Sequence, residues 1–326
     1  VQVHALSPLP KTDLAEREKA AQALNTELAQ ALLKTGPFDM VYERYSLWSY
    51  AGIALAKRFG TPSVLEVNAP LIEEQSQHRG LVNEAEARRI AKQVFANASL
   101  VSAVSQEVAN YVKLSEAKTN VVVSPNGVNL ERFSPTVPAT APCSKFTLGF
   151  VGTLKPWHGL DTLVAAFESL SDEEMRLLIV GDGPERSRLE TLLSPKYRQQ
   201  VEFTGAVSPE EIPGLLSSMD VAVAPYPALE HFYFSPLKLY EYMAAGLPVV
   251  ASQIGQISQI INHGHNGLLY EAGNSSALAQ SLAYLKEQAE LRERLSLAAR
   301  ATAETHSWDA NLGKLLSHLN LEKVLN

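Results

Sequence analysis

Short apolar runs alternate with helical patterns along this chain, and this alternation constrains the fold more than any other feature. The run Thr147–Val151 precedes a helical pattern over Leu160–Leu170, and the run Arg176–Val180 precedes a second pattern that ends near Leu193. Short apolar strands between helices are typical of a parallel sheet with helices on both faces. We therefore predict the α/β class, with doubly wound parallel sheets.

The first half of the chain shows the same rhythm. Apolar residues recur at helical spacing from Leu14 to Leu33, and strand-like runs cover Ser63–Val67 and Leu100–Val104. The stretch after the first of these runs is polar as far as Ala91, and we assign no regular element to it. This half is predicted to form a Rossmann-like domain like the second half.

Length and a proline-rich stretch set the predicted domain boundaries. A chain of 326 residues is long enough for about two domains of ordinary size. Ser134–Pro142 contains three prolines and little that can pack, which is typical of a linker. Because doubly wound sheets bind ligands outside the carboxyl ends of their strands, we expect the domains to face each other across a cleft. The predicted segments are a first domain (1–133), a linker (134–144), a second domain (145–307) and a C-terminal helix (308–326).

Composition excludes several classes of function. The chain has 28 Lys and Arg against 35 Asp and Glu, a formal net charge of −7, which argues against nucleic-acid binding. The single cysteine, Cys143, can form neither an internal disulfide nor a thiolate metal site, and this fits a reducing cytoplasm. The most apolar stretches fall short of the ~18 residues that a membrane-spanning helix needs. We expect a cytoplasmic protein, either free in the cytoplasm or in peripheral contact with the inner face of the membrane.

Three loops that follow predicted strands have the composition of phosphate-binding loops. The first opens at Gly152 and includes Lys155, the second opens at Gly181, and the third covers Phe234–Lys238. Helix N-termini attract anions, and Glu241, one turn into the third helix, has the acidic side chain that accepts hydrogen bonds from ribose hydroxyls in dinucleotide sites. One such loop is more often a simple turn, but three at the same sheet edge favour a nucleotide site.

Four ordered segments resemble a known family. They read VGTLKPWHGLDTLVAAF, LLIVGDGPERSRLE, VEFTGAVSPEEIPGLLSSMDVAVAPYP and FYFSPLKLYEYMAAGLPVVAS. In this order they resemble the donor domain of retaining, nucleotide-sugar-dependent glycosyltransferases of family 4, which have the two-domain GT-B fold. The resemblance extends from about Asp39 to Trp308.

The resemblance implies where the substrates bind. A UDP- or GDP-sugar is the expected donor and binds the second domain, whereas the acceptor binds the first. The family requires no metal or other cofactor, and this chain has no Asp-x-Asp pair. The family also has two glutamates eight positions apart, but the first of them falls here on Tyr233, so sugar selectivity does not carry over. The expected donor-binding residues are Gly152, Thr153, Gly181, Gly183, Phe203, Tyr233, Phe234, Ser235, Pro236, Leu237 and Glu241.

The first donor loop departs from the family pattern. Thr153 and His158 stand where the family usually has an arginine and a lysine. The diphosphate gains negative charge as the glycosidic bond breaks, and this charge must be stabilised. We predict that Lys155 and Lys238 supply that stabilisation and act as catalytic residues.

The first domain offers candidates for the acceptor side. Asn68 follows the run Ser63–Val67, where many members of the family have a histidine near the reacting carbon. Asn68 cannot act as a base, but it can form hydrogen bonds with the sugar. This fits a retaining reaction in which the donor phosphate takes the acceptor proton. Glu43 and Arg44, at another strand end, are either an acceptor-side carboxylate and cation or a surface ion pair.

The start of the chain indicates that the first domain is truncated. The sequence opens at Val1 rather than at a methionine and has no glycine before Gly36. First domains of the family begin with a strand and a glycine-rich loop. We therefore expect the first domain to be incomplete at its N-terminus and less stable than the second.

The sequence predicts a metal-independent glycosyltransferase that moves a sugar with retention to an acceptor hydroxyl. By family analogy the acceptor is a glycan or glycolipid of surface polysaccharide or glycolipid synthesis. Two alternatives stay open. One is a nucleotide-sugar epimerase on the same fold, and the other is a non-catalytic nucleotide-sugar-binding protein, because Tyr233, Thr153 and Asn68 replace usual residues.

Overall fold

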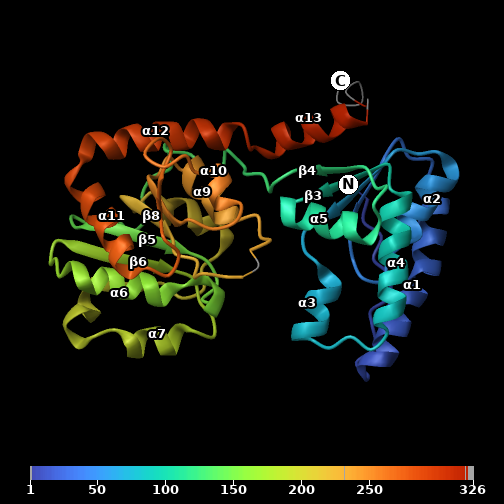
Figure 1. Ribbon diagram of the computed structural model, residues 1–326, viewed down its shortest axis with the longest axis horizontal. Coiled ribbons are helices and arrows are strands. Elements are labelled where there is room, and N and C mark those ends of the chain that lie inside the picture. Colours follow the sequence, from blue (N-terminus) through green and yellow to red (C-terminus); the bar gives the residue numbers. More distant parts are fainter. Residues whose placement is uncertain (1, 231, 320, 322–326) are drawn as a thin grey trace. The chain divides into compact units, whose positions relative to one another are not determined.

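The chain divides into two compact units, and each is described by itself. The computed structural model describes residues 2–230, 232–319 and 321. Unit 1 consists of Val1–Pro125, Tyr233–Ser235 and Leu312–Asn326, and unit 2 consists of Asn126–Phe232 and Pro236–Asn311. Both units are parallel-sheet α/β domains, as the alternation of strands and helices predicts (Figure 1).

The boundary between the units differs from the expected one. Unit 2 begins at Asn126, so the whole segment 134–144 belongs to it. The amide of Thr140 donates to the carbonyl of Gly214 at 3.0 Å, and the carbonyl of Ala141 accepts from the Arg176 guanidinium at 2.8 Å. The proline-rich stretch is therefore held against unit 2 by hydrogen bonds and is not a free linker.

Unit 1 is built on a sheet whose described strands are all parallel and follow the order β1-β2-β3-β4. Helix α13 (Trp308–His318) begins in unit 2 and ends in unit 1, and residues 320 and 322–326 of the predicted C-terminal helix lie outside the described residues. The other elements are α1 (Leu14–Thr35), β1 (Val41–Arg44), α2 (Ala51–Phe59), β2 (Ser63–Val67), α3 (Leu71–His78), α4 (Glu84–Asn97), β3 (Leu100–Ala103), α5 (Gln106–Ser115) and β4 (Val121–Val123).

Four helices of unit 1, which are α1, α2, α4 and α5, pack side by side over its sheet. Helix α1 packs on α2, α2 on α4, and α4 on α5. Their apolar faces cover inward side chains such as Leu65 and Val101, which are fully buried with Ile90 and Phe95. Because the described strands follow one another in a single direction, right-handed crossovers place their helices on the same face. The strand-order reversal of a doubly wound sheet is therefore absent from the described part of this unit.

The polar stretch before Ala91 is helical, which the sequence interpretation missed. It contains α3 and most of α4. The solvent side of α4 is strongly charged, with Arg88 paired to Glu84 at 2.7 Å and Arg89 paired to Glu86 at 2.7 Å. The inward residues nevertheless keep helical spacing, and they are Ala87, Ile90, Ala91, Val94 and Phe95.

Unit 2 contains a parallel sheet in the order β10-β9-β8-β5-β6-β7. The chain turns back between β5 and β8, so this sheet is doubly wound as predicted. Its elements are β5 (Phe146–Val151), α6 (Leu160–Leu170), β6 (Met175–Val180), α7 (Arg186–Leu192), β7 (Val201–Phe203), α8 (Ile212–Leu216), β8 (Val221–Ala224), α9 (Leu237–Ala244), β9 (Val249–Ser252), α10 (Ile257–Ile260), β10 (Leu268–Tyr270), α11 (Ser275–Glu287) and α12 (Ala289–Glu304), with 3₁₀ turns at Pro156–His158, Pro195–Gln200 and Pro209–Glu211.

Helices cover both faces of the second sheet. Helices α6 and α11 pack together over one face, where Leu148, Phe150 and Leu177 are fully buried. Helices α8 and α9 contact the other face, and α12 packs on α9. Figure 1 shows α6 on one side of this sheet and α12 on the other. The reversal between β5 and β8 leaves a switch point at the carboxyl ends of these strands, where ligands bind in such folds.

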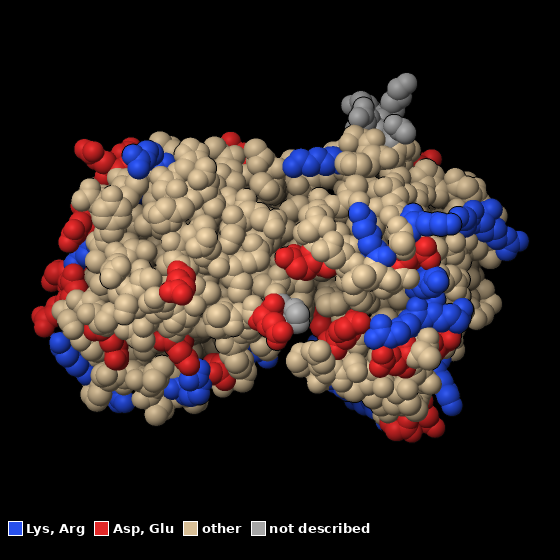
Figure 2. All heavy atoms as spheres, in the orientation of Figure 1, with Lys and Arg blue, Asp and Glu red and all other residues tan. Residues whose placement is uncertain are grey.

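The surface carries mixed charge. Acidic and basic side chains are interspersed on the face shown in Figure 2, in accord with the net charge of −7. In the part of the chain that the structure describes, no helix is long and apolar enough to cross a membrane.

Candidate functional site

The loops after β5 and β6 pack directly on each other. Gly181 has φ 127°, and a Cβ on it would lie 2.2 Å from the carbonyl oxygen of Gly152. Only glycine fits this close approach. The amide of Leu154 also donates to the carbonyl of Asp182 at 2.9 Å, which ties the two loops together.

The glycine amides of these loops already have partners. The amide of Gly152 donates to the carbonyl of Val180 at 3.0 Å, and that of Gly181 donates to the Thr204 hydroxyl at 3.2 Å. The amide of Gly183 donates to the Asp182 carboxylate at 2.8 Å. By contrast, the Thr153 amide makes no hydrogen bond with any described residue. The glycines shape the loop, and the Thr153 amide is the donor left for a ligand.

Lys238 lies where the first loop approaches α9. Its Nζ is 4.2 Å from the centre of the Phe150 ring and 5.3 Å from that of Tyr226. A Cβ on Gly152 would lie 3.0 Å from the same Nζ. The Nζ is buried and has no hydrogen-bond partner among the described residues. Burial lowers the pKa of Lys238 to about 7, although the nearby Glu241 carboxylate opposes this shift.

Helix α9 places three functional side chains on one side because they are spaced by three and four residues. Lys238 reaches the first loop, and Tyr242, four residues on, fixes the end of β5. The Tyr242 hydroxyl accepts from the Val151 amide at 2.8 Å and lies 3.3 Å from the Val151 carbonyl oxygen. Glu241 lies between them in sequence, and the hydrogen bonds of Tyr242 attach α9 to the end of β5.

Glu241 is a partly buried carboxylate without a hydrogen-bond donor among the described residues. Burial raises its pKa, and the charges of Arg132 and Lys238 partly offset this effect. The Arg132 guanidinium lies 5.0 Å from the Phe133 ring centre and donates to the carbonyl of Pro209. A carboxylate in this setting is available to accept hydrogen bonds from a ligand's hydroxyl groups.

His158 has a structural role that the sequence interpretation did not assign. Its Nδ1 lies 2.6 Å from the carbonyl oxygen of Thr153, so Nδ1 carries the proton and donates it to this bond. The ring centre lies 5.6 Å from that of Phe150 and 5.8 Å from that of Tyr226. Burial and the charge of Lys238 lower the pKa of His158 to about 4. His158 is therefore neutral at physiological pH and holds the Thr153 turn.

Lys155 does not join the group around Lys238. Its Nζ lies 5.6 Å from the ring centre of Trp157, whose side chain is 45% exposed. The structure thus brings Gly152, Lys238 and Glu241 into one neighbourhood and places Lys155 on the outer part of the same loop. The expectation that both lysines bind the diphosphate stays a prediction.

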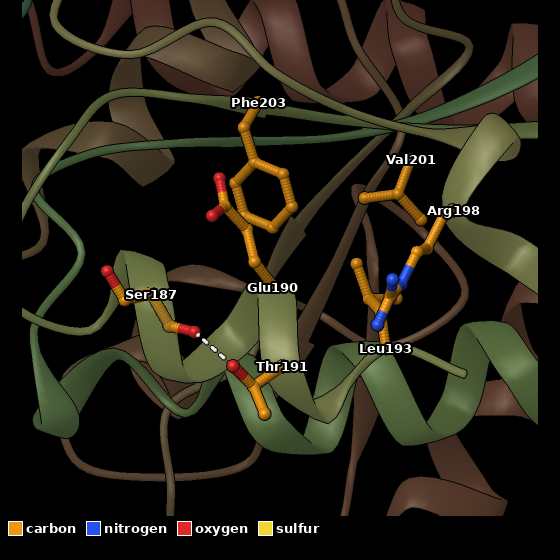
Figure 3. Close-up of a pocket in the computed structure, with 7 residues that line it drawn as sticks. All are labelled: Ser187, Glu190, Thr191, Leu193, Arg198, Val201 and Phe203. Carbon is orange, nitrogen blue, oxygen red and sulfur yellow. Dashed lines mark hydrogen bonds between the residues drawn. The ribbon is translucent and has the colours of Figure 1, made fainter. Parts of the chain in front are cut away.

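Phe203 lies on β7 and lines a hollow with residues of α7 (Figure 3). This hollow has a volume of about 490 Å³, and none of the other expected donor residues lines it. The guanidinium of Arg186 lies 5.9 Å from the Phe203 ring centre. The figure shows Glu190 beside Phe203, and the Thr191 hydroxyl donates to the Ser187 carbonyl at 2.8 Å.

The remaining expected donor residues divide between the two units. Pro236 and Leu237 begin α9 in unit 2, and Leu237 is 46% exposed. Tyr233, Phe234 and Ser235 group with unit 1. There the main-chain oxygen of Tyr233 accepts from the Ser105 hydroxyl at 2.9 Å. The Tyr233 hydroxyl donates to the Glu74 carboxylate. The rings of Tyr233 and Phe234 are tilted by 42° to each other, with their centres 4.4 Å apart.

In unit 1, Glu43 and Arg44 point to opposite faces of β1. The Glu43 carboxylate accepts from the Ser49 hydroxyl at 2.6 Å and from the Ile53 amide at 3.1 Å. It therefore caps the start of α2, and burial raises its pKa. A Cβ on Gly52 would lie 2.5 Å from one of its oxygens. Glu43 and Arg44 do not form the pair considered from the sequence.

Arg44 instead lies beside Glu66, a residue that sequence reasoning missed. The Glu66 carboxylate accepts from the Tyr42 hydroxyl at 2.7 Å and from the Asn68 amide group at 2.5 Å, and lies 3.8 Å from the Arg44 guanidinium. The side-chain oxygen of Asn68 is buried without a hydrogen-bond partner among the described residues. The alternation of side chains along β1 and β2 was the signal that could have found this cluster.

The described residues contain no group of three or more His, Cys, Asp or Glu side chains that could hold a metal ion. The described site offers a buried amine, a partly buried carboxylate and the free amide of Thr153.

Two family descriptions match the chain. Residues 145–288 match "Glycosyl transferases group 1", and residues 5–132 match "Glycosyltransferase Family 4". A D-inositol 3-phosphate glycosyltransferase of Xylanimonas cellulosilytica is 28% identical over 88% of this chain and 73% of its own length. A GDP-mannose-dependent alpha-mannosyltransferase of Mycobacterium tuberculosis is 29% identical over 84% of this chain and 70% of its own length.

Solved structures show the same fold. Sucrose-phosphate synthase from Thermosynechococcus elongatus has a TM-score of 0.74 at 22% identity and covers 97% of this chain and 82% of its own. Anabaena HepE in complex with UDP has a TM-score of 0.72 at 21% identity and covers 91% of this chain and 82% of its own. The matched relatives are transferases, which favours transfer over epimerisation or binding alone. The chain belongs to the family 4 glycosyltransferases, nucleotide-sugar-dependent enzymes with the GT-B fold.

Proposed function

We propose that this enzyme transfers a sugar from a UDP- or GDP-sugar to an acceptor hydroxyl with retention and without a metal ion. The observation that carries the proposal is the buried, unpartnered Nζ of Lys238 beside Gly152. A buried polar group without a partner is costly, and an anionic ligand removes that cost. The diphosphate of a nucleotide sugar is such a ligand, and it needs a cation as it leaves.

Glu241 fits the nucleoside part of the same donor. It follows Lys238 by one turn of α9, so a ligand whose phosphates meet Lys238 has its ribose within reach of this carboxylate. The names of the relatives support a nucleotide sugar as donor, because one of them is a GDP-mannose-dependent transferase. A neighbour in fold was solved with UDP-glucose. The proposal includes both UDP and GDP as the nucleotide of the donor.

The acceptor is proposed to be a glycan or glycolipid in surface polysaccharide or glycolipid synthesis, bound by unit 1. Asn68 offers its unpartnered side-chain oxygen as an acceptor, Arg44 offers hydrogen-bond donors, and Glu66 offers a carboxylate between them. Glu43 is not retained for this role, because its carboxylate already holds α2. Asn68 has no basic group, so the donor phosphate takes the acceptor proton in the proposed retaining reaction.

A donor screen tests the proposal. The enzyme is incubated with UDP- and GDP-sugars in the presence of EDTA, with and without a glycan or glycolipid extract, and free UDP or GDP is measured. We expect acceptor-dependent release that EDTA does not reduce, and a product whose anomeric configuration by NMR equals that of the donor. Conversion of the sugar without nucleotide release would favour an epimerase, and binding without turnover would favour a non-catalytic protein.

A further inference from the structure

We propose that above neutral pH Lys238 is mostly neutral in the empty enzyme and becomes charged when the donor diphosphate binds, so that each donor brings close to one proton into the site. This inference rests on the proposed function and adds that donor binding is coupled to the uptake of a proton. The family's usual loop cations carry their charge before the donor arrives, whereas Thr153 and His158 stand in their places here.

Among the described residues, the surroundings of Nζ provide no hydrogen-bond acceptor for an ammonium group. The ring faces of Phe150 and Tyr226 lie on it at 4.2 and 5.3 Å, and the backbone of Gly152 comes close because no side chain intervenes. Phe150 is fully buried and Tyr226 is 5% exposed, so water is largely excluded from this side. Aromatic faces attract a cation weakly, but they do not replace the hydration that an ammonium loses.

The charged and titratable groups around Lys238 leave its charge uncompensated. From α9 itself, the Glu241 carboxylate attracts the charge without bonding to it, and it also faces Arg132. From the loop after β5, His158 is neutral, and the Nζ of Lys155 turns to Trp157.

The ring of Tyr226 also faces Nζ, and burial raises the pKa of this phenol and of Tyr242, four residues along α9. Burial moves the pKa of Lys238 close to neutrality, to about 7.

A bound diphosphate reverses this balance. Negative charge within about 4 to 6 Å of an amine favours its protonated form. The neutral amine of Lys238 takes one proton from the solvent, the resulting ammonium donates hydrogen bonds to phosphate oxygens, and the proton returns to solvent when the nucleotide leaves. Above pH 7 the enzyme must pay for this protonation, so nucleotide affinity falls by about tenfold per pH unit.

Calorimetry measures the proton directly. UDP and GDP are titrated into the full chain at pH 8.0 in HEPES and in Tris, which differ in ionisation enthalpy, and the difference in binding heat gives the protons taken up. For the nucleotide that binds, we expect an uptake of about 0.9 proton, because an amine with a pKa of about 7 is mostly neutral at this pH. The dissociation constant is then measured from pH 6.5 to 9.

Lys238→Arg is the matched variant. Arginine stays charged over this range, so both the proton uptake and the steep rise in dissociation constant are expected to disappear, while nucleotide still binds. Titration of the nucleotide's own phosphate is the same with both proteins and cancels in the comparison. Lys145→Met, whose lysine donates to the carbonyl of Glu173 at 2.7 Å, should behave as wild type.

The outcomes separate the inference from the proposed function. Binding of UDP or GDP to the wild type with no proton uptake at pH 8.0 would overturn the inference alone, whether or not the arginine variant folds. Equal uptake by wild type and a folded, nucleotide-binding Lys238→Arg would overturn it as well. No binding of either nucleotide at pH 6.5 would overturn the proposed function and the inference with it.

Discussion

Polar residues of the donor site differ in whether the protein itself supplies hydrogen-bond partners for them. Tyr242 and His158 have hydrogen-bond partners and hold the loop in place. Lys238 and Glu241 have no hydrogen-bond partner among the described residues, although Nζ of Lys238 is buried and the Glu241 side chain is partly buried. Substitutions of the second kind should change ligand binding and catalysis more than folding.

Glu241→Ala is expected to weaken binding of the nucleotide by about 1 to 3 kcal/mol, because charge-assisted hydrogen bonds to the ribose are lost. The protein should stay folded, since no described residue donates to this carboxylate. Calorimetric titration with UDP and GDP at pH 6.5 measures the change, and Glu293→Ala, an exposed position on α12, is the control. Unchanged affinity would remove Glu241 from the site.

Lys238→Met is expected to lower kcat more than it raises KM, because the charge on the diphosphate grows in the transition state. Lys155→Met tests the second predicted lysine in the same way, and Lys145→Met is the control. Steady-state kinetics with the donor found in the screen give both constants. Wild-type turnover of Lys155→Met would show that Lys238 and backbone amides suffice, whereas wild-type turnover of Lys238→Met would contradict its catalytic role.

The identity of key residues was easier to predict than their surroundings. The spacing on α9 indicated Lys238 and Glu241, but burial of the amine depends on Phe150 of β5 and on Tyr226 in the loop after β8. Glu43 and Arg44 were placed together although adjacent residues of a strand point to opposite faces. Applying that alternation would have directed attention to Glu66.

At the level of elements, short hydrogen-bonded contacts align α9 with the end of β5. The interior of unit 2 was predictable where apolar periodicity is regular, and α6 begins and ends at the residues that the pattern indicates. Helix α4 was missed because Arg88 and Arg89 dominate its composition, although Ile90 and Val94 keep the helical repeat. To predict a helix with one strongly charged face, the spacing of its apolar residues must be examined rather than its overall polarity.

Tyr242→Phe tests the link between α9 and β5. The change leaves the Val151 amide without its acceptor in a buried position, and we expect a loss of about 1 to 3 kcal/mol in the free energy of unfolding. Tyr284→Phe removes a hydroxyl from a side chain that is 52% exposed and should change stability little. Urea denaturation compares the two. An equal effect of both substitutions would contradict the link.

Gly181→Ala tests the packing of the two loops. A methyl group there would meet the Gly152 carbonyl oxygen at 2.2 Å and would also strain a backbone with φ 127°. We expect a loss of about 1 to 3 kcal/mol in stability together with weaker nucleotide binding. Gly264→Ala, with φ 78° and no atom within 4 Å of the added methyl, is the control and should leave nucleotide binding unchanged. Unchanged binding in Gly181→Ala would show that the loops do not shape the site.

At the scale of the whole molecule, the sequence predicted two α/β domains and their family. It predicted the position of the boundary between the domains less well. Prolines between 134 and 144 suggested a linker, but they do not prevent hydrogen bonds such as that from Thr140 to Gly214. The boundary at Asn126 follows from tertiary contacts of this kind, and such contacts produce no recognisable pattern in the local sequence. The expected incompleteness of the first domain stays a prediction.

The central claim is that unit 2 binds the donor nucleotide at the loop after β5 and at α9. Hydrogen–deuterium exchange of the full chain, with and without saturating UDP or GDP, tests this claim most directly. We predict slower exchange of amides in residues 152–159 and 237–244 when the nucleotide is bound, and loss of that protection in Glu241→Ala at the same nucleotide concentration. Protection confined to residues 41–78, or an unchanged exchange pattern with a nucleotide that binds, would contradict the account.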